Sequence, residues 1–311
     1  MTPEHESPEF YDRPMVRRLQ EIFGFPVAPG KVTEQQFDCL QRELEALARL
    51  QWHQIGAREL SIYLMDLCYA TLQQELFDYL FPAALILWWE GQLSRKGGPE
   101  GECDFYHAVD HGAALYKMMN VECRQHVYHW MIDAYMDGVD AWAGELRTTH
   151  LGPDAPNDLH GPLWSFNSLG KSVPILEDIL ERLMDVSTLG RAQWWLVFAS
   201  GLIWRENECP AVPPWTPDGG GGGIYLLEED SAIYDHGYLS ENHRAFKDQI
   251  TYANVLAMLL HANEILLETE YAEWAAMAFD KFENDADAIK SRIDALVSAH
   301  MQLKLEREWD R

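Results

Sequence analysis

Apolar residues recur at every third or fourth position through most of this chain, and the pattern is clearest near its C-terminal end. The members of this C-terminal stripe are Ala275, Ala278, Phe282, Ala286, Ile289, Ile293, Leu296, His300 and Leu303. Such spacing predicts one long helix with a single apolar face that other helices must cover. Neighbouring segments also carry apolar faces, so we favour packing within the same fold over a coiled coil with a second chain. His300 is then interpreted as a core histidine.

The same spacing predicts helices upstream. A capping-box pattern at Thr33 and Gln36 opens a helix that continues to Leu47. A second helix is expected from Ile62 until Pro82, which should break or restart it because proline lacks the backbone N–H. Further helices are expected at 104–119, 121–144, 174–186, 190–205 and 241–268. With 47% hydrophobic and 12% aromatic residues to fill a core, the predicted fold class is all-α, an irregular multi-helix bundle.

Two regions rich in proline and glycine interrupt the helices. Residues 147–173 contain three prolines and three glycines, and residues 206–240 contain four prolines and the run of five glycines at 219–223. Such composition prevents long helices and marks connectors. The chain is therefore either a single all-α unit over residues 1–311 or two helical subdomains, 1–146 and 174–311, joined by the connector 147–173. Alternating apolar residues allow one short β-hairpin near 224–239.

Three features bear on the cellular compartment. The first ten residues carry three glutamates and no lysine or arginine, whereas a secretory signal opens with positive charge. The apolar run at 80–89 is far shorter than the roughly 20 residues that a membrane-spanning helix needs. Five cysteines without a CxxC pair indicate neither a zinc ribbon nor a disulfide framework. We therefore expect a cytoplasmic protein.

The strong negative charge of the chain limits the partners that it can bind. The chain has 24 Lys and Arg against 50 Asp and Glu, a formal net charge of −26. Nucleic-acid binding depends on Lys and Arg that displace counterions from phosphates, so we expect no nucleic-acid partner. Residues 206–287 hold 17 Asp and Glu against three Lys and Arg. Such density attracts a basic partner, although an acidic face can also serve solubility alone.

Aromatic side chains flank the carboxylates in the middle of this region, a combination typical of protein–protein interfaces. The candidate partner-binding residues are Trp215, Tyr225, Glu228, Glu229, Asp230, Tyr234, Asp235 and Tyr238. The aromatic rings would supply buried area, and the carboxylates would orient a basic protein.

The histidines offer an alternative, metal-dependent function. His107 and His111 are four residues apart and so share one face of a helix, as metal ligands would. A helical hairpin that turns at Asn120 would bring His129 and Asp133 to them, which gives four ligands for a metal-dependent hydrolase. The surrounding string YHAVDHGAAL is similar to the histidine motif of the cyclic-nucleotide phosphodiesterases, but the chain lacks the His-Asp dipeptide that this family needs.

Other signatures of catalysis are missing from the sequence. It contains no HExxH helix and no GxSxG elbow, and no Gly-Lys-Ser/Thr follows the five-glycine run. We therefore favour a role without catalysis and expect no cofactor.

A helical build, the lack of catalytic motifs and the concentrated negative charge give the chain a resemblance in type to the immunity proteins of interbacterial toxin systems. The resemblance rests on residues 206–287 and their charge, with no motif match. It implies an inhibitor that forms a tight complex with one basic partner, such as a toxin or nuclease domain. The remaining alternative is a helical scaffold or oligomerisation protein in which the C-terminal stripe pairs chains.

Overall fold

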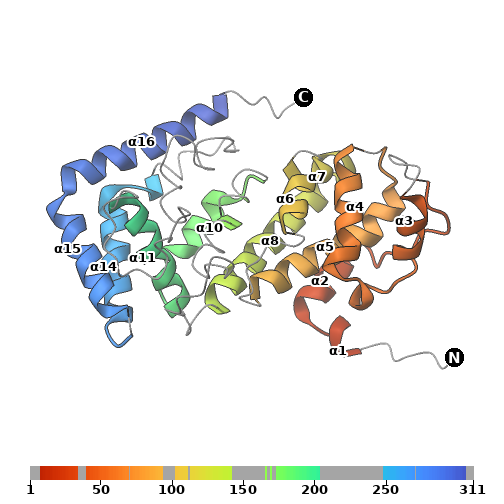
Figure 1. Cartoon of the computed structure of the whole chain (residues 1–311), viewed down its shortest axis with the longest axis horizontal. Coiled ribbons are helices and arrows are strands. Elements are labelled where there is room, and N and C mark those ends of the chain that lie inside the picture. Colours follow the sequence, from red (N-terminus) through yellow and green to blue (C-terminus); the bar gives the residue numbers. More distant parts are fainter. Residues whose placement is uncertain are drawn as a thin grey trace. The chain divides into compact units, whose positions relative to one another are not determined.

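A computed structural model of the chain describes residues 8–33, 40–69, 71–93, 102–110, 113–141, 165–166, 169, 173–203, 248–269 and 271–305. Over these residues it contains thirteen α-helices, one 3₁₀ turn and no strand, so the all-α prediction is confirmed (Figure 1). The hairpin expected near 224–239 lies outside the described residues.

The chain divides into two compact units. The first comprises Met1–Gly91 and Gly98–Ala134, and the second comprises Gln92–Gly97 and Tyr135–Arg311. The division falls within helix α8 (Val121–Ala141). The connector expected at 147–173 lies almost entirely outside the described residues.

Helix α5 (Gln74–Leu93) is a long, almost fully buried helix of the first unit. The other described elements of this unit are α1 (Pro8–Tyr11), α2 (Pro14–Ile22), α3 (Gln41–Leu47), the 3₁₀ turn η1 (Trp52–Gln54), α4 (Ala57–Tyr69), α6 (Glu102–Asp110), α7 (Ala114–Met118) and the first part of α8. Helix α5 (Gln74–Leu93) buries nearly every residue between Leu76 and Trp89. Its Phe77 and Phe81 rings stack with centroids 4.7 Å apart, and Phe105 of α6 continues the stack at 6.2 Å from Phe81. Aromatic packing therefore fixes α6 on α5.

Pro82 lies inside α5 and does not end it, so the prediction that Pro82 breaks or restarts the helix is wrong. The break lies earlier, between the end of α4 at Tyr69 and the start of α5 at Gln74. A proline within a helix costs about 3 kcal/mol, because one backbone hydrogen bond is lost and the ring crowds the preceding turn. Each large apolar side chain that α5 buries returns about 1.5–3 kcal/mol, so burial on all sides of the helix outweighs that cost.

Helix α11 (Leu189–Ile203) forms the centre of the second unit. The elements of this unit are the last part of α8, α10 (Leu176–Leu183), α11 (Leu189–Ile203), α14 (Tyr252–Leu266), α15 (Ala272–Asn284) and α16 (Ala286–Leu305). Helices α14, α15 and α16 all contact α11 (Figure 1). Arg292 of α16 donates hydrogen bonds of 2.7 and 2.6 Å to the carbonyls of Leu202 and Ile203. These bonds satisfy carbonyls that the end of α11 leaves open.

The C-terminal stripe is divided between two helices, so the prediction of one long helix is wrong in that respect. Asp285, with φ −102° and ψ 27°, separates α15 from α16. Asn284 and Asp285 are poor helix formers because their short polar side chains compete for backbone hydrogen bonds. The stripe residues buried within the chain include Ala275, Ala278, Phe282, Ile289 and Ile293. This part of the stripe packs within its own fold, as favoured; the side chains of Leu296 and His300 lie outside the described residues.

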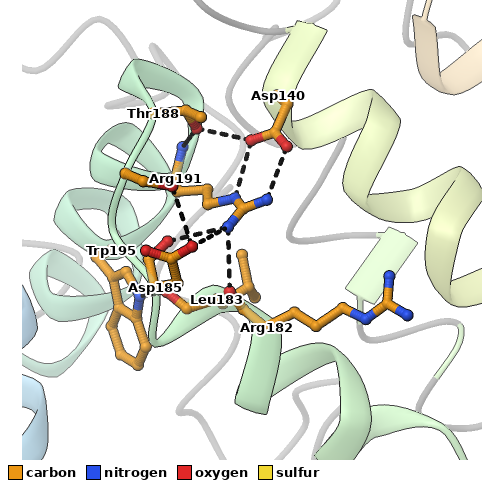
Figure 2. Close-up of polar contacts among 8 residues, drawn as sticks. Asp140, Arg182, Leu183, Asp185, Thr188, Arg191 and Trp195 are labelled. Carbon is orange, nitrogen blue, oxygen red and sulfur yellow. Dashed lines mark hydrogen bonds and ion pairs between the residues drawn. The ribbon is translucent and has the colours of Figure 1, made fainter.

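A polar cluster around Arg191 ties together helix ends in the second unit. Its Nε and Nη2 donate to the two carboxylate oxygens of Asp140 on α8, at 2.9 and 2.8 Å, and its Nη1 donates to the Asp185 carbonyl at 3.1 Å (Figure 2). The Thr188 hydroxyl donates to Asp140 at 2.6 Å and accepts from the Arg191 N–H at 3.3 Å. The start of α11 is therefore fixed to the ends of α8 and α10.

Gly190 allows the backbones of α8 and α11 to meet next to this cluster. A Cβ atom at Gly190 would lie 1.9 Å from the carbonyl oxygen of Val139, a distance that no real Cβ atom adopts. Only glycine fits at this position. Gly190 and Arg191 together fix α11, the helix against which α14 and α15 pack.

Candidate functional site

Exposed carboxylates lie along α14, α15 and the start of α16, which form the described part of the acidic region. Every described Asp and Glu between 248 and 287 is exposed, and we name this set the acidic surface: Asp248, Glu264, Glu268, Glu273, Asp280, Glu283, Asp285 and Asp287. Lys281 is the single Lys or Arg in the sequence between those positions. The local charge is therefore strongly negative and faces solvent.

Helical spacing places the α15 carboxylates on one face. Glu273, Asp280 and Glu283 follow one another at seven and three residues, and the helix buries the opposite side through residues of the C-terminal stripe. Residues at such spacing share a side of the helix. The acidic face of α15 is thus held outward by the same packing that buries its apolar face on α11 and α14.

Among the described residues, three basic side chains lie within 4 Å of a carboxylate of the acidic surface. Lys281 Nζ lies 2.9 Å from Asp285, Lys290 Nζ lies 3.7 Å from Asp287, and His261 Nδ1 lies 3.7 Å from Glu264. Exposed pairs of this kind contribute about 0–1 kcal/mol and are weakened further by salt. The carboxylates that make no ion pair with any described residue are Asp248, Glu268, Glu273, Asp280 and Glu283. Within the described part of the chain, no ion pair therefore offsets the charge of these five carboxylates.

The pKa of Tyr252, at the start of α14, responds to this negative charge. Its hydroxyl donates to the carbonyl of Phe282 at 3.0 Å, and Lys290 Nζ lies 5.0 Å from its ring centroid. Burial raises the pKa of the Tyr252 phenol, and the charges of Glu283 and Asp287 raise it further. The two carboxylates oppose a negative phenolate, so they act together at this point of the surface.

We expect the double change Glu283→Gln and Asp287→Asn to lower the pKa of Tyr252, because removal of two nearby negative charges favours the phenolate. The measurement is a pH titration of ring-labelled tyrosine by ¹³C NMR. Glu21→Gln, an exposed change in the first unit, should leave the Tyr252 titration unchanged. An unchanged pKa in the double variant would mean that solvent screens these carboxylates completely.

The partner-binding residues predicted from the sequence fall between positions 215 and 238. Trp215, Tyr225, Glu228, Glu229, Asp230, Tyr234, Asp235 and Tyr238 all lie outside the described residues. Their assignment stays a prediction. None of the predicted partner-binding residues lies on α15, although the spacing of Glu273, Asp280 and Glu283 opposite the apolar stripe is a sequence signal for an acidic face there.

The predicted metal ligands are only partly described. His107 is half-buried on α6, His129 is exposed on α8, and His111 lies outside the described residues. Asp133 of α8 accepts a hydrogen bond and ion pair from Arg18 of α2. Asn120 caps the start of α8, since its Oδ1 accepts a hydrogen bond from the N–H of Cys123 at 2.9 Å. In the part of the chain that the structure describes, no three His, Cys, Asp or Glu side chains gather as a metal site would require.

Arg18 and Asp133 meet although 115 residues separate them. A cation from α2 therefore pairs with the carboxylate of Asp133, one of the metal ligands predicted from the sequence. Metal content of protein purified without added metal remains the direct test of the alternative hydrolase function.

No described helix is both long enough and apolar enough to cross a membrane. Comparison of the chain with protein-family models, curated proteins and solved structures finds no match.

Proposed function

We propose that this chain is an acidic binding protein that neutralises a basic protein partner, as an immunity or inhibitor protein does against a toxin or nuclease domain. The observation that carries the proposal is the acidic surface, where eight exposed carboxylates face solvent and a single Lys or Arg lies among them in the sequence. Unpaired charges of one sign repel each other and destabilise the compact state. A cationic partner would relieve that repulsion.

Rigid support favours binding of another folded surface. Helices α14 and α15 pack on α11, and Arg191 and Gly190 fix the start of α11 to its neighbours. Carboxylates on fixed helices present a constant pattern of charge. Such a pattern speeds encounter with a complementary surface and disfavours partners of the wrong charge.

The same charge disfavours other classes of partner. Phosphate backbones and anionic lipid surfaces are themselves negative and bind Lys and Arg clusters. A chain with a net charge of −26 and a local excess in 206–287 repels both. A basic protein surface is the class of macromolecule that fits.

The experiment is photo-crosslinking in the native host. A photo-reactive phenylalanine analogue replaces Tyr225 or Tyr238, two of the predicted partner-binding residues. The control carries the same analogue at Val121, an exposed apolar position of the first unit. We expect one basic protein to be crosslinked from Tyr225 or Tyr238 and not from Val121, with a yield that falls as salt rises. Equal crosslinking from all three positions, or crosslinks to acidic proteins alone, would contradict the proposal.

A further inference from the structure

Helix α14 carries a second, largely apolar stripe on its outward side. Leu260 and Leu267 are 42% and 60% exposed, and Ala253 is exposed seven residues before Leu260. The half-buried Leu256 and Asn263 lie between them. Spacings of seven residues, with intermediate positions three residues on, form the a and d pattern by which one helix receives another. We name these five residues the α14 seam.

The seam is distinct from the face by which α14 joins the fold. The helix buries Val255, Leu259, Ala262 and Leu266, which follow one another at four, three and four residues. That face packs on α11 and α15. The seam lies on another side of the helix, where Leu260 and Leu267 stay exposed. Leu267 continues the helical backbone at φ −52° and ψ −36°, so it stays in line with Leu260.

Charge beside the seam selects among possible occupants. Glu264 on α14 and Glu268, two residues after its end, are exposed beside the seam and belong to the acidic surface. A second copy of this chain would bring the same carboxylates against them, and like charges at such positions oppose pairing. An anionic membrane is opposed for the same reason. A helix with apolar residues on one face and Lys or Arg beside them satisfies both the leucines and the carboxylates.

We propose that the α14 seam docks an amphipathic helix of a basic protein partner, with Leu260 and Leu267 as apolar anchors and with Glu264 and Glu268 facing its cations. This inference rests on the proposed function and names the surface and the structural element that the partner presents. The anchors are two helical turns apart, about 10 Å along the axis. A helix laid along the seam would cover both anchors at once.

A designed peptide tests the seam directly. The probe is a helical peptide of about three heptads, with Leu at its a and d positions and Lys elsewhere; a counterpart carries Glu in place of Lys. Binding to the full chain is measured by fluorescence anisotropy for the wild type, for the double variant Leu260→Ser and Leu267→Ser, and for Val121→Ser. Val121 is 64% exposed and provides the matched control for loss of an exposed apolar side chain.

We expect the Lys peptide to bind the wild type and Val121→Ser equally, and to lose about tenfold or more in affinity with the double leucine variant. The Glu peptide should not bind. Equal binding of the Lys peptide to the wild type and the double leucine variant would contradict the proposal that the seam docks a basic helix. No binding to either protein would contradict it as well. So would a dimer of the wild type in sedimentation that the leucine changes dissolve, because the occupant would then be a second copy.

A third variant separates failure of the seam from failure of the proposed function. Glu264→Gln with Glu268→Gln removes charge and leaves both anchors. If this variant weakens binding of the Lys peptide and the leucine variant does not, the seam is wrong while attraction of a basic partner stands. Crosslinking from Tyr225 and Tyr238 tests the proposed function without any reference to α14.

Discussion

Replacement of Gly190 by alanine is expected to destabilise the second unit by about 3 kcal/mol, near the upper end of the cost of overpacking in a core. The added methyl group would lie 1.9 Å from the carbonyl oxygen of Val139. That oxygen belongs to the backbone of α8, so no side chain can rotate away to make room. The two helices must separate, and separation pulls Arg191 away from Asp140. Urea unfolding followed by tryptophan fluorescence measures the loss, since Trp194 and Trp195 are fully buried in α11.

Gly30→Ala provides the matched control for Gly190→Ala. A Cβ atom at Gly30 meets nothing within 4 Å, so we expect a change of no more than about 0.5 kcal/mol. Hydrogen exchange then shows where the loss lies. Amides of α11 should exchange faster in Gly190→Ala and not in Gly30→Ala. Equal stability of the two variants would show that α8 and α11 do not meet at Gly190.

Arg191→Met is expected to cost about 3 kcal/mol, because it leaves the Asp140 carboxylate partly buried without its cation. The Arg191 side chain is 15% exposed, and it holds Asp140 through two parallel hydrogen bonds. The variant also removes the hydrogen bond from Nη1 to the carbonyl of Asp185 (Figure 2). Methionine keeps most of the volume of the arginine side chain, so the loss of stability comes from the polar contacts and not from a cavity.

Two further variants isolate the contribution of the Arg191 pair. Asp140→Asn combined with Arg191→Met should cost less than the sum of the single changes, by about 1–3 kcal/mol, because the two side chains interact directly. Arg49→Met is the control, since the Arg49 side chain is 79% exposed and lies 4.0 Å from Glu45; its cost should stay below about 1 kcal/mol. Additive losses at Asp140 and Arg191 would contradict the proposed coupling.

Local pattern predicted much of the fold. Helix α8 was expected at 121–144 and observed at Val121–Ala141, and Asn120 caps it. These features depend on residues close in sequence. That α5 continues through Pro82 could not be predicted in the same way. The burial that offsets the cost of this proline comes from helices elsewhere in the chain. The break at Asp285 was missed because an apolar period of three and four residues continues across it.

The candidate site was predictable in composition and not in detail. The excess of carboxylates between 206 and 287 is visible in the sequence, but the pairing of Lys281 with Asp285 required the structure. Long-range pairs were invisible for a simple reason. Arg191 and Asp140 are separated by 51 residues, and no periodicity relates them. The exposure of Leu260 likewise depends on which face of α14 the other helices cover.

The rate at which this chain associates with the basic protein crosslinked from Tyr225 or Tyr238, followed at low and moderate ionic strength, tests the central claim most directly. Reversal of charge at Glu228, Glu229 and Asp230 to lysine should slow association about tenfold at low salt and flatten its salt dependence. A control variant carries the same change in net charge at exposed glutamates outside the acidic region, Glu21, Glu43 and Glu181. It should keep nearly the wild-type rate. Association rates that are independent of salt and equal in the wild type, the charge-reversal variant and the control variant would show that the carboxylates of 206–287 do not attract the partner.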